Sequence, residues 1–340
     1  MSTKKKHPRP NPIVAAMYTL RDMDVDVILI HGPAGCGFMA SRPLEEAGIR
    51  VVTSGMGENE LIFGGTDALV RTLKSAYDEF RPKTMAIVGT CASMIIGEDM
   101  EVAIKRAALD CNVFAVDCHG CMGDNTKGAI KALESACTRG ILDDEETDRQ
   151  ISLMKSATKL EKKSGMAARQ YLSPSRGMTK LDVCRQIINY LREGKRIAVV
   201  MIAKKELAYR FADMFTAMND ASGKFGGELG FFANMDGGIG LPRIRRYCDD
   251  INAELVENGV SVENIGGLDE YAIIGDRMKE RVDAFAPDLR IILGICHSYP
   301  EIGANDILVT DQPRQLANYL AQGFTAVGEI SSHTMVMGAR

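Results

Sequence analysis

Short apolar runs alternate with amphipathic segments along the first 140 residues, and this alternation limits the possible folds more than any other feature. Each run is rich in β-branched residues and ends at a turn, after which helical periodicity begins. The runs are residues 25–30, 49–54, 84–89 and 112–117. Near-continuous apolar strands joined by helical crossovers are typical of a parallel sheet covered on both faces. The sequence therefore predicts an α/β fold with a doubly wound parallel sheet.

The second half of the chain repeats this pattern. Strands are predicted at residues 196–202, 228–233, 290–295 and 306–310. Helices are predicted at residues 179–192, 205–218, 243–258, 269–285 and 313–322. The predicted organisation is a flexible basic tail at 1–10, a first lobe at 11–140, a charged helical bridge at 141–195 and a second α/β lobe at 196–340. A division of the second lobe near 265–285 is left open.

The charge balance argues against two classes of partner. The chain has 41 Lys and Arg against 45 Asp and Glu, a net charge of −4, so it has no overall cationic field for a nucleic acid backbone or an anionic membrane. No apolar run approaches the roughly 18–20 residues of a membrane span. Residues 1–10 lack the apolar stretch of a secretory signal, which predicts a cytoplasmic protein with reduced thiols.

The nine cysteines fall into two groups by their local context. Four lie inside helical patterns or open a strand, which is typical of buried packing residues. These four are Cys111, Cys137, Cys184 and Cys248. The others follow predicted strand ends, where glycine neighbours allow a tight turn and leave a thiolate at the ligand-binding edge of the sheet. These five are Cys36, Cys91, Cys118, Cys121 and Cys296.

Common nucleotide and zinc-hydrolase motifs are absent from the sequence. It contains no GxxxxGKS or GxxxxGKT, no GxGxxG after the first strand and no HExxH. We therefore expect neither ATP hydrolysis nor NAD binding by the chain itself, and cysteine remains the available metal ligand.

Cys36 and Cys91 can share a site only if two strand-end loops converge. Two thiolates do not complete a four-thiolate iron–sulfur site. Either Cys118 and Cys121 add the missing ligands within one chain, or a second chain supplies an equivalent pair across a two-fold axis. Cys118 and Cys121 also flank His119 as a CxxC motif, which could be a redox pair or part of a pocket wall. The residues alone leave these arrangements open.

Three segments carry a family resemblance. HGPAGCGF begins at residue 31, SGMGENELIFGGTDALVRTLK at residue 54 and VGTCASMIIGEDME at residue 88. In this order and approximate spacing they resemble the catalytic-component proteins of nitrogenases and nitrogenase-like reductases. The chain is most similar to short family members from methanogens, which form a γ-lactam ring on a nickel tetrapyrrole on the way to coenzyme F-430. Nitrogenase subunits are longer and have a further cluster cysteine upstream of HGPxGC, which residues 1–30 here lack.

The resemblance implies both a fold and a function. The fold would consist of Rossmann-like lobes of the nitrogenase component 1 type, and the activity would be that of an oxidoreductase and cyclase component. Cys36 and Cys91 would ligate a 4Fe-4S cluster, one per homodimer and shared at the interface. A nickel tetrapyrrole would be the substrate, and a separate nitrogenase-reductase-like ATPase would deliver electrons with ATP hydrolysis. The competing functions are a non-catalytic scaffold for metallocofactor assembly, another nitrogenase-like tetrapyrrole reductase, and a chelate-binding module with packing cysteines.

Three further residues are candidates for catalysis, and each has a structural alternative. His31 could ligate a metal or donate a proton, or its ring could brace the HGP turn. Glu60 could feed protons to the substrate or cap the following helix. His297 follows a strand of the second lobe and could be an axial nickel ligand, a proton source or an ordinary loop histidine.

Overall fold

The computed structural model describes residues 11–164, 178–270, 272, 274 and 276–329. The predicted basic tail at residues 1–10 lies outside these residues. The chain divides into two compact units, Met1–Leu160 with Leu241–Arg243 and Glu161–Gly240 with Ile244–Arg340. Within the described ranges, no helix is both long enough and apolar enough to span a membrane.

The first unit contains a four-stranded parallel sheet with the order β2-β1-β3-β4. Its strands are β1 (Val27–His31), β2 (Arg50–Thr53), β3 (Thr84–Gly89) and β4 (Asn112–Val116). Its helices are α1 (Pro12–Asp22), η1 (Ala34–Cys36), α2 (Phe38–Glu46), α3 (Glu58–Phe63), α4 (Thr66–Phe80), α5 (Cys91–Ile95), α6 (Met100–Ala107) and α7 (Asn125–Thr138). The predicted doubly wound α/β arrangement is confirmed for this unit.

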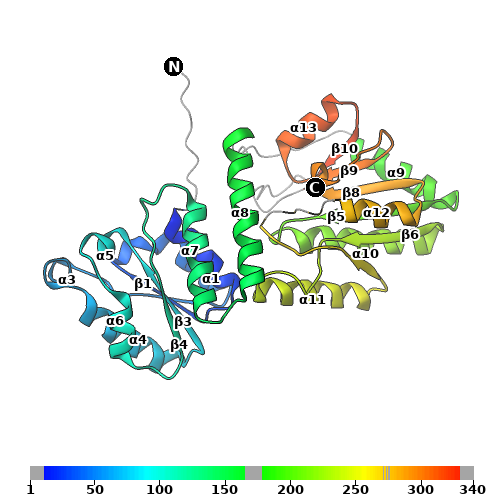
Figure 1. Cartoon of the computed structure of the whole chain (residues 1–340). Helices are drawn as coiled ribbons and strands as arrows, with labels where there is room; N and C mark the ends of the chain where they lie inside the picture. The colour runs from blue at the N-terminus through cyan, green and yellow to red at the C-terminus, as the bar shows by residue number, and fades with distance from the viewer. Residues whose placement is uncertain (1–10, 165–177, 271, 273, 275, 330–340) are drawn as a thin grey trace, which may run out of the picture. The chain divides into compact units, whose positions relative to one another are not determined.

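Helices cover both faces of the first sheet. α1 packs against α7 on one face, and α4 packs against α6 on the other (Figure 1). All five residues of the central strand β1 are buried, because the strand faces helices on both sides. Val27 and Leu29 of β1 pack with Leu69 and Leu73 of α4. The apolar run that predicted this strand therefore reflects burial on two faces.

The strand order places a topological switch at the centre of the first sheet. β2 pairs with one edge of β1, and β3 pairs with the other. In open α/β sheets, ligands bind at the carboxyl ends of the strands beside such a switch. His31 and Gly89 form the last register pair of β1 and β3. Cys36 and Cys91, the two cysteines that the family resemblance implies as cluster ligands, follow these two strands. They therefore lie beside the switch.

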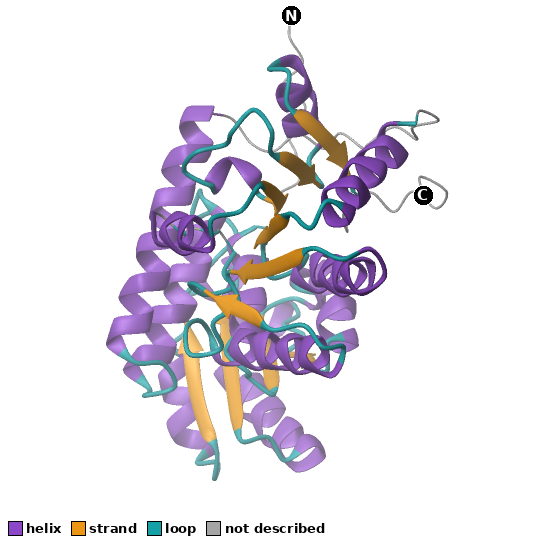
Figure 2. Ribbon diagram, turned by 90° about the vertical axis from the view of Figure 1, so that its right-hand side faces the viewer, coloured by secondary structure: helices purple, strands orange, loops and turns teal. Residues whose placement is uncertain are grey.

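The second unit contains a six-stranded parallel sheet with the order β10-β9-β8-β5-β6-β7. Its strands are β5 (Arg196–Ile202), β6 (Glu228–Ala233), β7 (Val262–Asn264), β8 (Leu289–Gly294), β9 (Ile307–Thr310) and β10 (Thr325–Gly328). Its helices are α9 (Thr179–Arg192), α10 (Ala208–Phe225), most of α11 (Pro242–Glu257), α12 (Asp276–Phe285), η2 (Cys296–Ser298) and α13 (Pro313–Ala321). Figure 2 shows helices flanking the strands.

Two neighbouring phenylalanines show how the second sheet is covered. Phe231 packs against Phe215 of α10 with ring centroids 5.0 Å apart. Phe232 packs against Phe285 of α12 with centroids 6.0 Å apart. Successive side chains of a strand point to opposite faces, so α10 and α12 cover opposite faces of the sheet. This sheet is also doubly wound, with its switch between β5 and β8.

Most predicted elements are confirmed within the usual uncertainty of element ends. β3, β5, β6 and α9 have the predicted bounds. β7 and β10 were not predicted, because these short edge strands carry no apolar run. The helix predicted from residue 269 begins only at Asp276. The helix predicted to end at residue 218 continues to Phe225, where Gly226 with a φ of 93° ends it.

Residues 141–195, predicted to form a bridge, contain two long helices. α8 (Asp144–Ser164) crosses the boundary between the two compact units. α9 packs against α10 and β5 of the second unit. Residues 265–285, where a division of the second lobe was left open, separate β7 from β8, and both strands belong to one sheet.

We predict that Gly128→Ala destabilises the first unit, because α1 and α7 meet at this glycine. An added Cβ would lie 1.9 Å from the carbonyl oxygen of Pro12, and overpacking of this kind costs about 1–3 kcal/mol. Gly223→Ala in α10 is the matched control. Nothing lies within 4 Å of its added Cβ, and Ala is favoured over Gly in helices by up to about 1 kcal/mol. Chemical denaturation of both variants checks the prediction, and an unchanged midpoint for Gly128→Ala would contradict it.

Candidate metal centre

His31 ends β1, and its side chain is fully buried. Its Nδ1 lies 3.0 Å from the Ser54 hydroxyl, and its Nε2 lies 3.4 Å from a carboxylate oxygen of Glu98. Burial lowers the pKa of His31 below its ordinary value although Glu98 opposes the shift, so the ring is neutral at neutral pH. Because a carboxylate only accepts, Nε2 donates to Glu98 and Nδ1 accepts from Ser54. This geometry favours the bracing alternative over contact with a substrate.

Glu98 connects three loops, and the sequence analysis did not single it out. Its side chain is 5 % exposed. It accepts from the Gly65 N–H at 2.5 Å and from the Thr66 hydroxyl at 2.9 Å, in addition to His31. Gly65 and Thr66 begin α4. The one pointer to Glu98 in the sequence is its place within the family segment VGTCASMIIGEDME.

Thr90 fixes the start of α5 and thereby the position of Cys91. Its hydroxyl donates to the carbonyl oxygen of His31 at 2.9 Å and accepts from the Ser93 N–H at 3.4 Å. An added Cβ at Gly32 would lie 2.2 Å from Thr90 Oγ1, so this close approach requires glycine. The chain after β3 is therefore held against the chain after β1, and Cys91 begins α5 beside this contact.

Cys36 and Cys91 are half-buried free thiols on the loops after β1 and β3. Burial raises the pKa of Cys36, and the neighbouring Cys91 raises it further. The two thiols lie on loops that follow adjacent strands, β1 and β3. The backbone N–H of Gly120 donates to Cys91 Sγ at 3.2 Å, and a hydrogen bond of this kind stabilises the thiolate form that binds metals. The structure therefore places Cys36 and Cys91 at the same edge of the first sheet, after neighbouring strands.

Cys121 and His119 lie next to Cys91. The Cys121 thiol is exposed, and its Sγ is 3.7 Å from Cys91 Sγ. A hydrogen bond and the charge of Cys91 raise the pKa of Cys121. The Cys121 N–H donates to His119 Nδ1 at 3.3 Å. Ligand atoms of Cys91, His119 and Cys121 all lie within 4.8 Å of one another. At this spacing the three side chains could bind one metal ion.

Two of the five strand-end cysteines are buried in the core, so the prediction that their thiols face the ligand edge is wrong. Cys118 is 0 % exposed, its Sγ lies 3.9 Å from the Gly89 carbonyl oxygen, and burial raises its pKa to about 12. Cys296 is also 0 % exposed, and its Sγ donates to the Ile292 carbonyl oxygen at 3.2 Å. Burial raises its pKa to about 12. In both cases the side chain turns back toward backbone carbonyl groups at the end of a strand.

Glu60 caps α3, which is the structural alternative to a role in proton transfer. Its carboxylate accepts from the Gly57 N–H at 2.9 Å, which satisfies a donor at the start of the helix. Hydrogen bonds from the backbone N–H groups of Gly57 and of Glu60 itself lower the pKa of Glu60. The group is therefore ionised at neutral pH and carries no proton to donate.

His297 lies in the second unit, after β8 and beside the switch of that sheet. Its side chain is exposed, and its Nδ1 is 3.5 Å from the Tyr319 hydroxyl. Partial burial and then the charge of Lys204 lower its pKa, so the imidazole is neutral at neutral pH. A neutral, exposed imidazole can bind a metal ion or accept a proton.

The four cysteines predicted to be packing residues differ in their burial. Cys248 is buried in α11, and burial raises its pKa to about 12, which confirms the prediction. Cys111 and Cys137 are half-buried, and Cys137 Sγ donates to Asp144 at 3.1 Å. Cys184 is exposed on α9, so the packing prediction is wrong there, because that part of α9 faces solvent.

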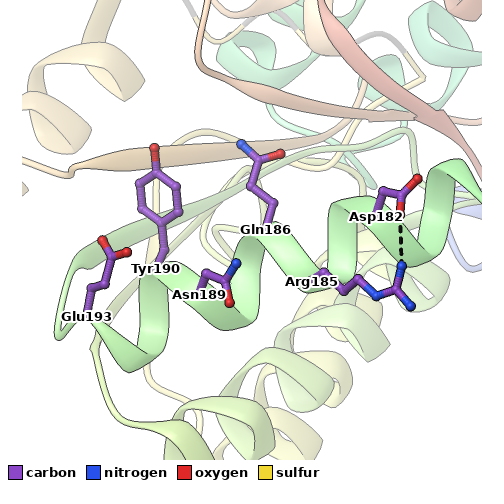
Figure 3. A pocket seen from close by; sticks show the side chains of 6 residues that line it. All are labelled: Asp182, Arg185, Gln186, Asn189, Tyr190 and Glu193. Carbon is purple, nitrogen blue, oxygen red and sulfur yellow. Dashed lines mark hydrogen bonds and ion pairs between the residues drawn. The ribbon is translucent and has the colours of Figure 1, made fainter.

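The pocket drawn in Figure 3 lies in the second unit and has a volume of about 390 Å³. Its lining residues are Asp182, Arg185, Gln186, Asn189, Tyr190 and Glu193. Five of the side chains come from α9 and the sixth, Glu193, from the residue that caps it, and Arg185 is paired with Asp182 at 3.2 Å along the helix. The pocket contains no thiol or imidazole, so it is a polar helix surface and the thiols at the strand ends remain the candidate site.

Comparison with known proteins identifies the family of the chain. A family model described as nitrogenase component 1 type oxidoreductase matches residues 12–163. Component CfbD of the Ni-sirohydrochlorin a,c-diamide reductive cyclase complex of Methanothermobacter thermautotrophicus is 45 % identical over 98 % of this chain and 94 % of its own length. The same component from Methanosarcina acetivorans is 42 % identical over 98 % and 92 %, and that from Methanocaldococcus jannaschii is 40 % identical over 98 % and 95 %. The chain belongs to the CfbD family.

Membership of the CfbD family confirms the resemblance found in the sequence. The three segments that carried it, together with all the thiols at the switch of the first sheet, lie within residues 12–163. The two doubly wound parallel sheets agree with the nitrogenase component 1 type of fold.

We predict that Glu98→Ala strongly destabilises this member of the CfbD family. The substitution leaves the Gly65 N–H, the Thr66 hydroxyl and His31 Nε2 without their acceptor. At about 1 kcal/mol or more for each buried donor, the expected loss is about 3 kcal/mol. Glu60→Ala is the matched control, because its exposed carboxylate accepts from a helix start, and its effect should be much smaller. Equal losses in denaturant unfolding would contradict the prediction.

Proposed function

We propose that the chain is the substrate-reducing component of a nitrogenase-like reductive cyclase in coenzyme F-430 biosynthesis. Its substrate would be Ni-sirohydrochlorin a,c-diamide, whose ring system is reduced and gains a γ-lactam. The observation that carries the proposal is the pair of thiols, Cys36 and Cys91, at the switch of the first sheet. Three relatives named as component CfbD of the Ni-sirohydrochlorin a,c-diamide reductive cyclase complex, similar over nearly the whole chain, support it.

A 4Fe-4S cluster fits Cys36 and Cys91 by the chemistry of the donors. Both are free thiols on loops of adjacent strands. Thiolate sulfur is the usual protein ligand of such clusters, and hydrogen bonds to that sulfur tune them. The Gly120 N–H supplies one such bond to Cys91. Such a cluster would relay single electrons from the partner protein to the ring.

A two-fold homodimer that shares one cluster is part of the proposal. Two thiols from each of two chains make the four that such a cluster ordinarily has. Exposed apolar side chains of the first unit support an interface there. Phe38, two residues after Cys36, is 76 % exposed, and Ile95, on the same helix as Cys91, is 84 % exposed. Phe63 at the end of α3 is 83 % exposed, and exposed apolar surface of this kind is typical of protein contacts.

A separate protein would supply the electrons. The sequence has no phosphate-binding loop of the GxxxxGKS or GxxxxGKT type, so ATP hydrolysis is assigned to a nitrogenase-reductase-like ATPase of the CfbC type. The relatives are named as one component of a complex, which supports the need for such a partner.

The chain's own residues would position the thiols and meet the substrate. His31 and Glu98 act as positioning residues, because they fix the strand ends from inside the protein. His297 would contact the tetrapyrrole, as an axial ligand of nickel or as a proton source. Its Nδ1 faces Tyr319, so Nε2 is the nitrogen that would ligate nickel or hold a proton.

Turnover of Ni-sirohydrochlorin a,c-diamide tests the proposed function. The anaerobic chain is combined with its ATPase partner, ATP and a reductant, and the reduced lactam product is measured by mass spectrometry. We expect product only when all components are present. A chain that binds a cluster, gives no product and passes a metallocofactor to another protein would be a scaffold, and this result would overturn the proposal.

We predict that Cys36→Ala and Cys91→Ala abolish the cluster, because each removes a thiolate ligand. Cys184→Ala is the matched control, since this exposed thiol lies on α9, and it should keep the full cluster. Iron and sulfide analysis of anaerobically purified variants provides the measurement. The parent should contain about four irons per dimer. A full cluster in Cys36→Ala, or about four irons on a monomer, would contradict the shared site.

A further inference from the structure

The turn at residues 119–121 carries two metal-ligating side chains that the proposed cluster does not use. His119 and Cys121 lie beside Cys91, and ligand atoms of the three residues are within 4.8 Å of one another. Cys121 is exposed, while Cys91 and His119 are half-buried, so an ion from solvent can reach all three.

The distance between the two sulfurs matches that expected around one tetrahedral ion. Zinc–sulfur bonds of about 2.3 Å at the tetrahedral angle place two sulfurs about 3.8 Å apart. Cys91 Sγ and Cys121 Sγ are 3.7 Å apart. In a 4Fe-4S cluster each thiolate binds a different iron, so two cluster ligands lie farther apart than this. The pair therefore fits one mononuclear ion better than two corners of one cluster.

The surroundings of the three side chains also favour a bound cation. The Cys121 N–H donates to His119 Nδ1 at 3.3 Å, which holds the imidazole beside Cys121. Because Nδ1 has a single lone pair, it gives up this hydrogen bond if it is the atom that binds the ion. The Gly120 N–H donates to Cys91 Sγ at 3.2 Å, which stabilises the thiolate.

We propose that the cluster-free chain binds one zinc ion through Cys91, Cys121 and His119. Two sulfurs and one imidazole nitrogen are a donor set that zinc prefers, and zinc binds such a set more tightly than ferrous iron does. A solvent molecule completes the tetrahedron. The site is distinct from the cluster, but it shares Cys91 with it.

Sharing Cys91 makes zinc and the cluster mutually exclusive in one chain. This consequence rests on the proposed function, because it requires Cys91 to be a cluster ligand. A chain loaded with zinc should therefore assemble its cluster more slowly than a zinc-free chain.

Cobalt is the probe for the zinc site, because tetrahedral cobalt with thiolate ligands absorbs in the near-ultraviolet and visible ranges. The full-length chain is freed of iron, kept reduced and titrated with Co²⁺ without air. We expect a thiolate-to-cobalt charge-transfer band that saturates at one ion per chain and disappears on addition of one Zn²⁺ per chain. A chain that shows no charge-transfer band would overturn the proposal.

Four variants test the ligand set. Cys121→Ser should weaken Co²⁺ binding at least about 100-fold, more than the loss of a supporting contact around a metal site usually does. His119→Gln should weaken it at least about 10-fold and change the visible bands. Cys184→Ser, which alters an exposed thiol on α9, should bind like the parent. Cys36→Ser should also keep the cobalt site although it loses the cluster. An unchanged cobalt spectrum in Cys121→Ser, or its loss in Cys36→Ser, would overturn the ligand set.

Cluster reconstitution separates this proposal from the proposed function. One equivalent of Zn²⁺ should slow the assembly of the cluster in the parent at least about 10-fold, in line with a competing site, and should have much less effect in Cys121→Ser. If the cluster forms and turnover occurs but cobalt never binds thiolates, the zinc site alone is refuted. If cobalt binds as expected but no cluster forms, the proposed function fails and the zinc site stands.

Discussion

A buried carboxylate is the interaction on which the strand-end loops of the first unit depend. Glu98 is 5 % exposed and accepts hydrogen bonds from His31, the Gly65 N–H and the Thr66 hydroxyl. A carboxylate removed from water is tolerated only when donors satisfy it, so these contacts are required by its burial. They connect the end of β1, the start of α4 and the chain after α5. Cys36 follows β1 and Cys91 begins α5, so both thiols lie next to segments that this network holds.

Cys91 and Cys296 occupy equivalent positions on two similarly wound sheets. Each is the second residue after the glycine that ends its strand, Gly89 of β3 and Gly294 of β8, and each strand lies across the switch from the first strand of its unit. Cys91 begins the α-helix α5 and remains half-buried, whereas Cys296 begins the short 3-10 helix η2 and donates to a carbonyl group in the core. The first unit therefore presents thiols at its switch, while the second presents the imidazole of His297.

The features that could be predicted from the sequence are those that depend on the residues of one short segment. Apolar runs located the long strands, because two-sided burial requires them, and the family segments located Cys36 and Cys91. The sequence could not separate Cys118 from Cys121, since both follow β4 in a glycine-rich turn and only packing against β3 decides which thiol is buried. It also missed Glu98, whose partners lie 33 and 67 positions away along the chain. Contacts at such separations leave no periodic pattern in the sequence.

The burial of Cys118 bears on how many chains a four-thiolate cluster needs. One chain presents Cys36, Cys91 and Cys121 at the switch, and the last two lie too close together to bind separate irons of one cluster. Adding Cys118 would require the core at the end of β3 to open around a thiol whose pKa burial raises to about 12. Two chains related by a two-fold axis need no such change, because each contributes Cys36 and Cys91, which are half-buried on loops after adjacent strands. The proposed shared cluster is therefore the arrangement that leaves the core of each chain intact.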